Sequence, residues 1–393
     1  MSHKDRWLLP EGIDELMPTQ AAQLEVLRRK LIDRMQAWGY QLVFPPLVEY
    51  LDSLLTGTAK ALDLKTFKLT DQMSGRLMGI RADMTPQVAR MAAHNLRDQQ
   101  GVIRLCYIGN VLHTLPSGQG TSRNPVQLGA EIYGHAGPES DVEVVQLMVE
   151  TLGEIPDLLL DMGHVGIYRG LAHAAGLNPE QEQELFGALQ RKSTSDIESL
   201  LNEYQLPTSH KAMLLGLAEL NGGIEVLAKA KKLLTNASAS VQDALATLTT
   251  IATMIHQRLP ALAMNFDLAE LRGYHYHTGV VFAAYQSGTA QAIAMGGRYD
   301  DIGEDFGQAQ PATGFSLDLK TLVNQLTLNT VVAEPIAVTW ADDELQHKMV
   351  EQLRGEGEVV IYQLSGSEIP TTRILIQQES RWLVAETGTQ IRG

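Results

Sequence analysis

The chain has 393 residues, of which 44% are hydrophobic and 20% are charged. This composition is typical of a globular protein with a buried core, and the length predicts two or three domains at about 150 residues each. The net charge of −15 argues against a broad nucleic-acid surface, because an acidic chain repels polyanions. One cysteine, no run of ~20 apolar residues and no apolar N-terminal signal together favour a cytoplasmic protein that binds no membrane.

The first elements are a helix and several short strands. Apolar side chains at helical spacing predict an amphipathic helix over residues 18–39. Residues 40–48 predict a strand, which the double proline Pro45-Pro46 confines to a sheet edge or an interface. Residues 65–69 and 75–80 predict a hairpin. A helix is expected next, with Thr85 as its cap and Pro86 in its first turn.

Two further strands are expected at residues 101–107 and 126–134. Alternation in the second strand places Gln127, Gly129, Glu131 and Tyr133 on one face. If the other face packs on a helix, Gln127 and Glu131 point toward whatever lies opposite. The alternative is a solvent-exposed sheet face, which is common in antiparallel sheets.

The middle of the chain is helical in pattern. A helix is expected at residues 141–152 and a strand at 158–162, and residues 170–262 have the periodicity of several amphipathic helices. This stretch carries no cluster of catalytic side chains. We interpret it as a helical insertion.

A polar aromatic segment follows, Leu-Arg-Gly-Tyr-His-Tyr-His-Thr-Gly at residues 271–279. Such a segment suits the floor of a small-molecule site, and an aromatic edge strand is the alternative. Strands are expected at 280–285 and 290–295, and a strand leading into a helix at 313–320. The glycines at 296, 297 and 314 indicate backbone close to a ligand or a tight crossing.

The pattern as a whole predicts an α+β fold, an antiparallel sheet flanked by helices. We expect a main domain at residues 1–325, interrupted by the insertion, and a small C-terminal α/β domain at 331–393. No phosphate-binding loop, dinucleotide fingerprint or zinc-protease motif occurs. The histidines are scattered along the chain, so no metal site is expected.

Five blocks in order resemble the class II histidyl-tRNA synthetase catalytic domain, across roughly residues 8–325. That resemblance implies the class II synthetase fold. The blocks are LPEGIDEL at 9–16, IRADMT at 80–85, RLCYIG at 104–109 with QLGAEIYG at 127–134, the segment at 271–279, and GGRYD at 296–300 with Gly314-Phe315.

The departures from this family concern the handling of ATP. Where motif 2 has an arginine and a glutamate, this chain has His113 and Leu115. Motif 3 ends in Asp318 and Thr321, where the family has a glycine and the arginine that contacts the ATP phosphates. Neither histidine nor threonine replaces arginine at a bidentate phosphate contact, so adenylate formation is not expected.

The resemblance implies that the amino-acid pocket is better kept than the ATP site. Its positions for the α-ammonium group of histidine correspond to Asp83, Gln127 and Glu131, with Thr85 beside them. Arg272 would meet the carboxylate or another polar part of the ligand. The aromatic positions against the imidazole ring correspond to Tyr276 and His277, and Tyr299 would close the wall, giving a predicted pocket of Asp83, Thr85, Gln127, Glu131, Arg272, Tyr276, His277 and Tyr299.

A synthetase body that keeps this pocket and loses ATP handling resembles the regulatory subunit of short-form ATP phosphoribosyltransferase. That family implies a non-catalytic homodimer without cofactors, which joins the short catalytic subunit in a hetero-oligomer. It would activate the first step of histidine biosynthesis and carry feedback inhibition by L-histidine. Three alternatives stay open: an active histidine–tRNA ligase, a scaffold with a vestigial pocket, and a class II ligase that acts on a protein.

Overall fold

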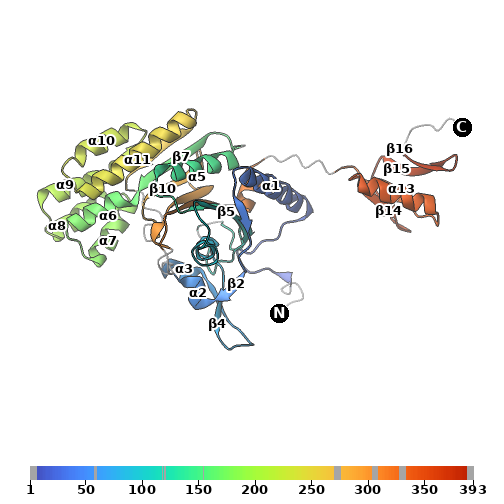
Figure 1. Ribbon diagram of the computed structural model, residues 1–393, viewed down its shortest axis with the longest axis horizontal. Helices are drawn as coiled ribbons and strands as arrows, with labels where there is room; N and C mark the ends of the chain where they lie inside the picture. The colour runs from blue at the N-terminus through green and yellow to red at the C-terminus, as the bar shows by residue number, and fades with distance from the viewer. Residues whose placement is uncertain are drawn as a thin grey trace. The chain divides into compact units, whose positions relative to one another are not determined.

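The computed structural model describes residues 7–56, 60–116, 118, 121–153, 155–269, 276–302, 309–326 and 333–386. The chain divides into two compact units, Met1–Leu328 and Asn329–Gly393, and Figure 1 labels their helices and strands. Each unit has its own sheet and its own buried core.

The first unit is built on a large mixed sheet. All neighbouring strands run antiparallel except the pairs β1–β5 and β7–β9, which are parallel. The predicted α+β fold with a mainly antiparallel sheet is thereby confirmed. In the described residues the strands lie in the order β1 (Gln41–Val43), β5 (Ile103–Asn110), β6 (Val126–Tyr133), β12 (Ala312–Asp318), β11 (Ala294–Arg298), β10 (Val280–Gln286), β7 (Leu158–His164), β9 (Ala263–Asp267) and β8 (Asn221–Gly222).

Helices cover both faces of this sheet. One face packs with α1 (Pro18–Ala37), α5 (Pro138–Thr151) and α12 (Leu319–Gln325), and Leu128 and Ala130 of β6 belong to that core. A smaller core on the other face joins α4 (Thr85–Arg90) and the π-helical turn η2 (Met91–Asn95) to Tyr107 and Tyr133. The predicted alternation of β6 is therefore correct.

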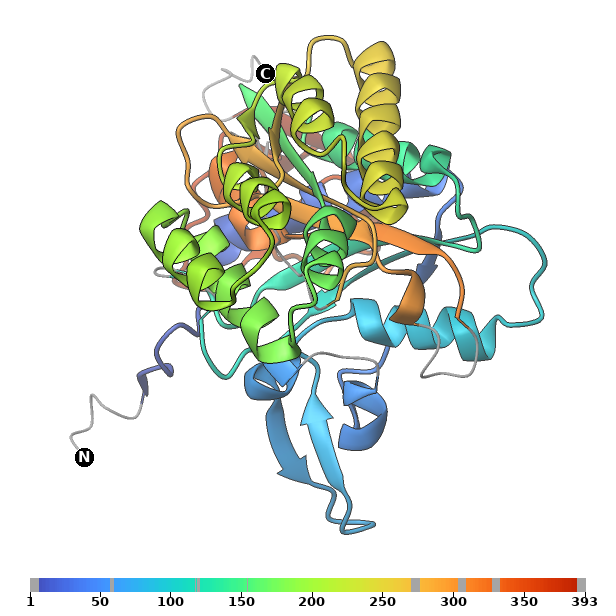
Figure 2. The same cartoon turned by 90° about the vertical axis from the view of Figure 1, so that its left-hand side faces the viewer.

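A three-stranded sheet stands apart from the large one in the first unit. Its strands lie in the order β2 (Val48–Tyr50), β4 (Leu77–Ile80) and β3 (Phe67–Thr70), next to the short helices α2 (Leu51–Leu55) and α3 (Lys60–Lys65). The β3–β4 hairpin projects away from the large sheet (Figures 1 and 2). Pro45-Pro46 lies between β1 and β2, where the chain changes sheet, as expected for residues that cannot donate to a ladder.

The start of α4 differs from the prediction. Thr85 is not the cap, because the residue before the helix is Met84 and no side chain caps it. The Thr85 backbone N–H instead donates to Asp83 Oδ1 at 2.9 Å. The Thr85 hydroxyl lies 2.8 Å from the Tyr107 hydroxyl, so the threonine side chain bonds a buried tyrosine and does not cap the helix.

Helices occupy most of residues 165–258, starting slightly before the predicted insertion. The long helix α11 runs beside the smaller ones in both views (Figures 1 and 2). The two-residue strand β8 extends the large sheet from within this stretch. The helices are α6 (Val165–Ala174), α7 (Pro179–Gln190), α8 (Thr194–Glu203), α9 (Thr208–Leu217), α10 (Glu225–Leu233) and α11 (Ala239–Arg258). Among the described helices of the whole chain, none has the length and apolar character needed to cross a bilayer.

Strand β11 lies later than predicted, at Ala294–Arg298 rather than at 290–295. Gly296 and Gly297, which the sequence predicted to lie close to a ligand or at a tight crossing, are inside this strand. A Cβ atom at Gly296 would lie 2.2 Å from the Gly314 carbonyl oxygen, so the glycine is required by close packing between strands.

The second unit is a four-stranded sheet with one helix, α13 (Glu344–Gly355), packed on it. Glu379 and Ser380 connect the last two strands with positive φ angles, as in the primed turns that favour hairpins. These two strands therefore form a hairpin. The strands lie in the order β14 (Val360–Gln363), β13 (Ile336–Thr339), β15 (Arg373–Gln378) and β16 (Arg381–Glu386).

Candidate ligand-binding site

A cavity of about 180 Å³ lies against the face of the large sheet that carries Glu131. Six of the eight predicted site residues line it. They come from the β4–α4 connection, from β6, and from the segments before β10 and after β11. The lining consists of Asp83, Thr85, Glu131, Tyr276, His277 and Tyr299, with Met295, Gly296, Gly314, Phe315 and Ser316.

Glu131 is the most deeply buried acid of the cavity, with 1% of its surface exposed. The Tyr107 hydroxyl donates to Oε1 at 2.9 Å, and the Tyr299 hydroxyl donates to Oε2. Burial raises the pKa of this carboxyl to about 8, although both tyrosine hydrogen bonds act in the opposite direction. The carboxyl is therefore poised to lose its proton when a cation enters the cavity.

Asp83 supplies a second carboxylate, which Gln127 holds in place. Gln127 Nε2 donates to Asp83 Oδ1 at 2.8 Å, and its Oε1 accepts the Met84 N–H at 2.8 Å. Gln127 does not line the 180 Å³ cavity. Its side-chain amide instead orients Asp83 and the backbone at the start of helix α4.

Three rings form the aromatic side of the cavity. The rings of Tyr276 and Tyr299 lie 5.1 Å apart at an interplanar angle of 31°. His277 meets Tyr276 edge-on at 5.3 Å. The buried Tyr276 hydroxyl has no hydrogen-bond partner within the described part of the chain, so it is available to a ligand. The predicted contact Arg272 lies outside the described residues.

A second cavity of about 280 Å³ adjoins the first, because both are lined by Asp83, Met295 and Ser316. Gln127, His113, Asp318 and Thr321 line it, whereas Leu115 is 63% exposed and lines neither cavity. In the synthetases that the sequence resembles, the corresponding motif positions handle ATP.

The side chains at those positions have other tasks here. His113 Nε2 lies 2.9 Å from the Ala82 carbonyl oxygen, and burial lowers the pKa of the ring. Thr321 donates to Asp318 Oδ2 at 2.8 Å, while Asp318 Oδ1 caps α12 through Lys320 N. A neutral imidazole and a capping network provide no cation for a phosphate.

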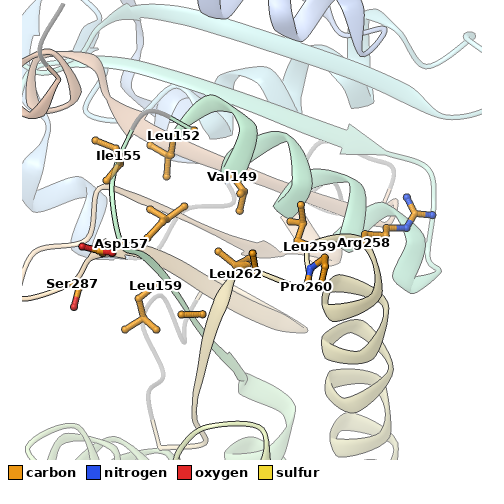
Figure 3. A pocket seen from close by; sticks show the side chains of 14 residues that line it. Val149, Leu152, Ile155, Asp157, Leu159, Arg258, Leu259, Pro260, Leu262 and Ser287 are labelled. Atoms are coloured by element: carbon orange, nitrogen blue, oxygen red, sulfur yellow. The ribbon is translucent and has the colours of Figure 1, made fainter.

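A larger cavity, of about 720 Å³, lies elsewhere in the first unit, at the ends of α5 and α11 and the start of β7 (Figure 3). Its lining is mostly aliphatic, including Leu152, Ile155 and Leu262. The Arg258 side chain points away from it and donates to Gln146. None of the predicted site residues lines it. Across the described ranges, no group of three or more His, Cys, Asp or Glu side chains is arranged to hold a metal ion.

Both units of the chain resemble known protein families. Residues 12–322 match the family model of histidyl-tRNA synthetase, and residues 333–385 match that of the ATP phosphoribosyltransferase subunit HisZ C-terminal domain. An ATP phosphoribosyltransferase regulatory subunit from Azotobacter vinelandii is 54% identical, over 98% of this chain and 99% of its own. The chain belongs to the family of ATP phosphoribosyltransferase regulatory subunits.

Other members of this family give the same result. The regulatory subunit of Pseudomonas putida is 53% identical, over 98% of this chain and 99% of its own. A solved structure from Bacillus halodurans, described as an ATP phosphoribosyltransferase regulatory subunit/histidyl-tRNA synthetase, superimposes with a TM-score of 0.82 at 27% identity. It covers 93% of this chain and 95% of its own. The predicted regulatory subunit of histidine biosynthesis, rather than a ligase, is confirmed.

Sequence reasoning missed several residues that shape the cavity of this regulatory subunit. Tyr107 holds Glu131 from the neighbouring strand, and Phe315 and Ser316 line the cavity from β12. Tyr107 stood in a predicted strand, but its partner depends on the register that pairs it with Gly129. A Cβ atom at Gly129 would lie 2.4 Å from the Tyr107 ring. A glycine in the middle of this strand was therefore the sequence signal that a bulky side chain packs there.

Proposed function

We propose that the 180 Å³ cavity binds L-histidine as an effector. The observation that carries the proposal is the pairing of two carboxyl groups, Asp83 and Glu131, with a wall of three rings in one cavity. The carboxyl groups suit an ammonium group, and the rings suit an imidazole. The volume is below the ~300–1,000 Å³ of pockets for drug-sized ligands, which suits an amino acid.

The first unit is proposed to form a homodimer that joins the short catalytic subunit of ATP phosphoribosyltransferase in a hetero-oligomer. Histidine bound here would inhibit that subunit, and the chain without histidine would activate it. Coupling between the two sites is expected to be ~1–3 kcal/mol and reciprocal, so substrates on the catalytic subunit change histidine affinity by the same factor. We place the complex in the cytoplasm, in keeping with one buried cysteine.

We propose two further features of the chain. The chain is proposed to form two domains, at residues 1–325 and 331–393. Residues 170–262 are a helical insertion in the first domain. Arg272 is proposed to bind the histidine carboxylate, so its replacement should affect the ligand more than assembly.

Calorimetry with L-histidine tests the effector site, on the purified chain and on its complex with the catalytic subunit. Tyr276→Phe removes the unpartnered hydroxyl and should weaken binding about two- to tenfold. Tyr204→Phe is the matched control, because its hydroxyl bonds Glu184 on the exposed surface. If neither the chain nor the complex binds histidine, the sensor proposal fails and the scaffold alternative holds.

L-Histidinol separates the roles within the site, because it keeps the ammonium group and the ring but lacks the carboxylate. The native chain should bind histidine more tightly than histidinol, and Arg272→Ala should remove that difference. Equal affinities in the native chain would reject Arg272 as the carboxylate contact. Histidine-dependent ATP–pyrophosphate exchange by the purified chain would favour the ligase alternative instead.

A further inference from the structure

Helix α6, the first of the helical stretch at residues 165–258, contacts the backbone behind the aromatic side of the cavity. Arg169 Nη2 donates to the His277 carbonyl oxygen at 3.2 Å. One turn earlier on α6, the Val165 N–H donates to the Gly279 carbonyl oxygen at 3.1 Å. Residues four apart lie on the same face of a helix, so one face of α6 holds this backbone at two points.

The end of β11 holds the same backbone from another direction. The Thr278 N–H donates to the Arg298 carbonyl oxygen at 2.8 Å, and the Thr278 hydroxyl accepts the Asp300 N–H at 2.9 Å. Residues 277–279 therefore have two supports. One belongs to the large sheet, and the other belongs to the helical stretch.

The ring of His277 depends on where this backbone lies. A Cβ atom at Gly297 would lie 2.7 Å from His277 Cδ2, so the ring rests against the backbone of β11. Tyr276 meets the same ring edge-on at 5.3 Å. Because His277 lines the cavity, a shift of its backbone would move the ring against these neighbours and change the shape of the cavity.

The position of Arg169 is set by the packing of the helical stretch. On one side of it in the sequence, the Tyr168 hydroxyl donates to the Glu182 carbonyl oxygen of α7 at 2.6 Å. On the other side, a Cβ atom at Gly170 would lie 2.6 Å from Val241 Cγ2 of α11. Helix α6 is therefore packed closely against two other helices, and its arginine is presented from a fixed element.

We propose that Arg169 is a positioning residue for the effector: its guanidinium holds the His277 backbone, which makes α6 a part of the effector site. This role rests on the function proposed above for the cavity. Arg169 does not line the cavity, so it acts through His277 without touching the ligand. A hydrogen bond from a charged donor is roughly twice as strong as a neutral one, which suits this role. The coupling is reciprocal, so bound histidine also stabilises α6.

Calorimetry of the full-length chain with two ligands tests this role. L-Histidine and Nτ-methyl-L-histidine share the ammonium and carboxylate groups and differ by one methyl group on the ring. The native chain should bind the methylated ligand more weakly, because a cavity of about 180 Å³ leaves little room for it. Arg169→Ala should weaken histidine binding about three- to tenfold. It should also narrow the difference between the two ligands, because a displaced His277 ring fits the imidazole less closely.

Two further variants separate positioning from general stability. Arg169→Lys keeps a charged donor, so it should recover part of the affinity and selectivity lost in Arg169→Ala. Arg191→Ala is the matched control, because this arginine belongs to the same helical stretch and its ion pair with Asp196 is exposed. A purely structural effect would lower both affinities by one factor and leave their ratio unchanged. Circular dichroism shows which variants are folded.

Hydrogen exchange tests the backbone support without any ligand. Arg169→Ala should speed exchange of the amides at residues 276–279 about three- to tenfold, whereas Arg191→Ala should leave it unchanged. In the native chain, saturating L-histidine should slow exchange along α6, because the coupling is reciprocal.

Either of two results would overturn this role of Arg169. An unchanged ratio of the two affinities in Arg169→Ala means that the arginine does not position the His277 ring. Unchanged exchange at residues 276–279 in that variant means that it does not hold this backbone. Failure of the proposed function looks different, because the native chain and its complex with the catalytic subunit then bind neither ligand. That result removes the effector role of Arg169 too, even where exchange shows that the arginine holds the backbone.

Discussion

Gly314 on β12 lies directly opposite Glu131 on β6, and a Cβ atom at Gly314 would lie 1.5 Å from Glu131 Oε2. The space left by this glycine is where the buried carboxyl sits. The cavity therefore depends on a residue that contributes no side chain to it.

Gly314→Ala should displace the Glu131 carboxyl from Tyr299 and Tyr107. We expect overpacking to cost about 1–3 kcal/mol of unfolding free energy, and histidine affinity to fall about tenfold or more. Urea unfolding and calorimetry measure the two effects. Gly355→Ala is the control, because a Cβ atom there meets nothing within 4 Å. Unchanged histidine binding in Gly314→Ala would contradict the assigned role of Glu131.

The pKa of Glu131, raised by burial from 4.5 to about 8, predicts a loss of stability as the pH rises from about 4.5 to about 8. Between these two values the folded chain holds a proton that the unfolded chain has released. The stabilisation is complete below pH 4.5 and is lost as the pH rises through 8. Glu131→Gln should reduce the fall in unfolding free energy between pH 5 and 8.5. Parallel curves for the native chain and the variant would show that this carboxyl is ionised throughout.

His164 predicts the opposite pH dependence. Its Nδ1 accepts the Gly166 N–H at 3.1 Å as the cap of α6, and burial lowers its pKa from 6.5 to about 4. Its contribution is complete above pH 6.5 and is lost as the pH falls through 4. His164→Asn keeps a capping side chain but does not titrate. The variant should lose less unfolding free energy between pH 7 and 4.5, and an equal loss would reject the assignment.

Gln127→Ala should weaken histidine binding without removing a ligand contact. The change frees Asp83 and leaves the buried Met84 N–H without its acceptor, at a cost of about 1–3 kcal/mol in unfolding free energy. Gln87→Ala is the matched control, because Gln87 is also buried but bonds the Pro46 carbonyl and Glu49. Both variants should melt earlier, and only Gln127→Ala should lose histidine affinity. The same affinity loss in both would mean that it follows from general destabilisation.

The sequence by itself predicted most elements, the fold and which side chains share a face of a strand. The alternation of Gln127, Glu131 and Tyr133 predicted which face of β6 meets the cavity, because side-chain direction in a strand follows from local backbone geometry. The five ordered blocks predicted the fold, and the residues at 113 and 321 predicted the loss of ATP handling. These conclusions depend on residue type and order along the chain.

Only the tertiary structure decided which groups act on one another. Gln127 orients Asp83, whereas Glu131 lines the cavity. These different roles follow from the packing of β6 against α4. The raised pKa of Glu131 requires its burial beneath Tyr107 and Tyr299, which lie 24 and 168 positions away in the chain. Desolvation and close contact depend on what the fold brings together, and spacing along a sequence does not encode strand register.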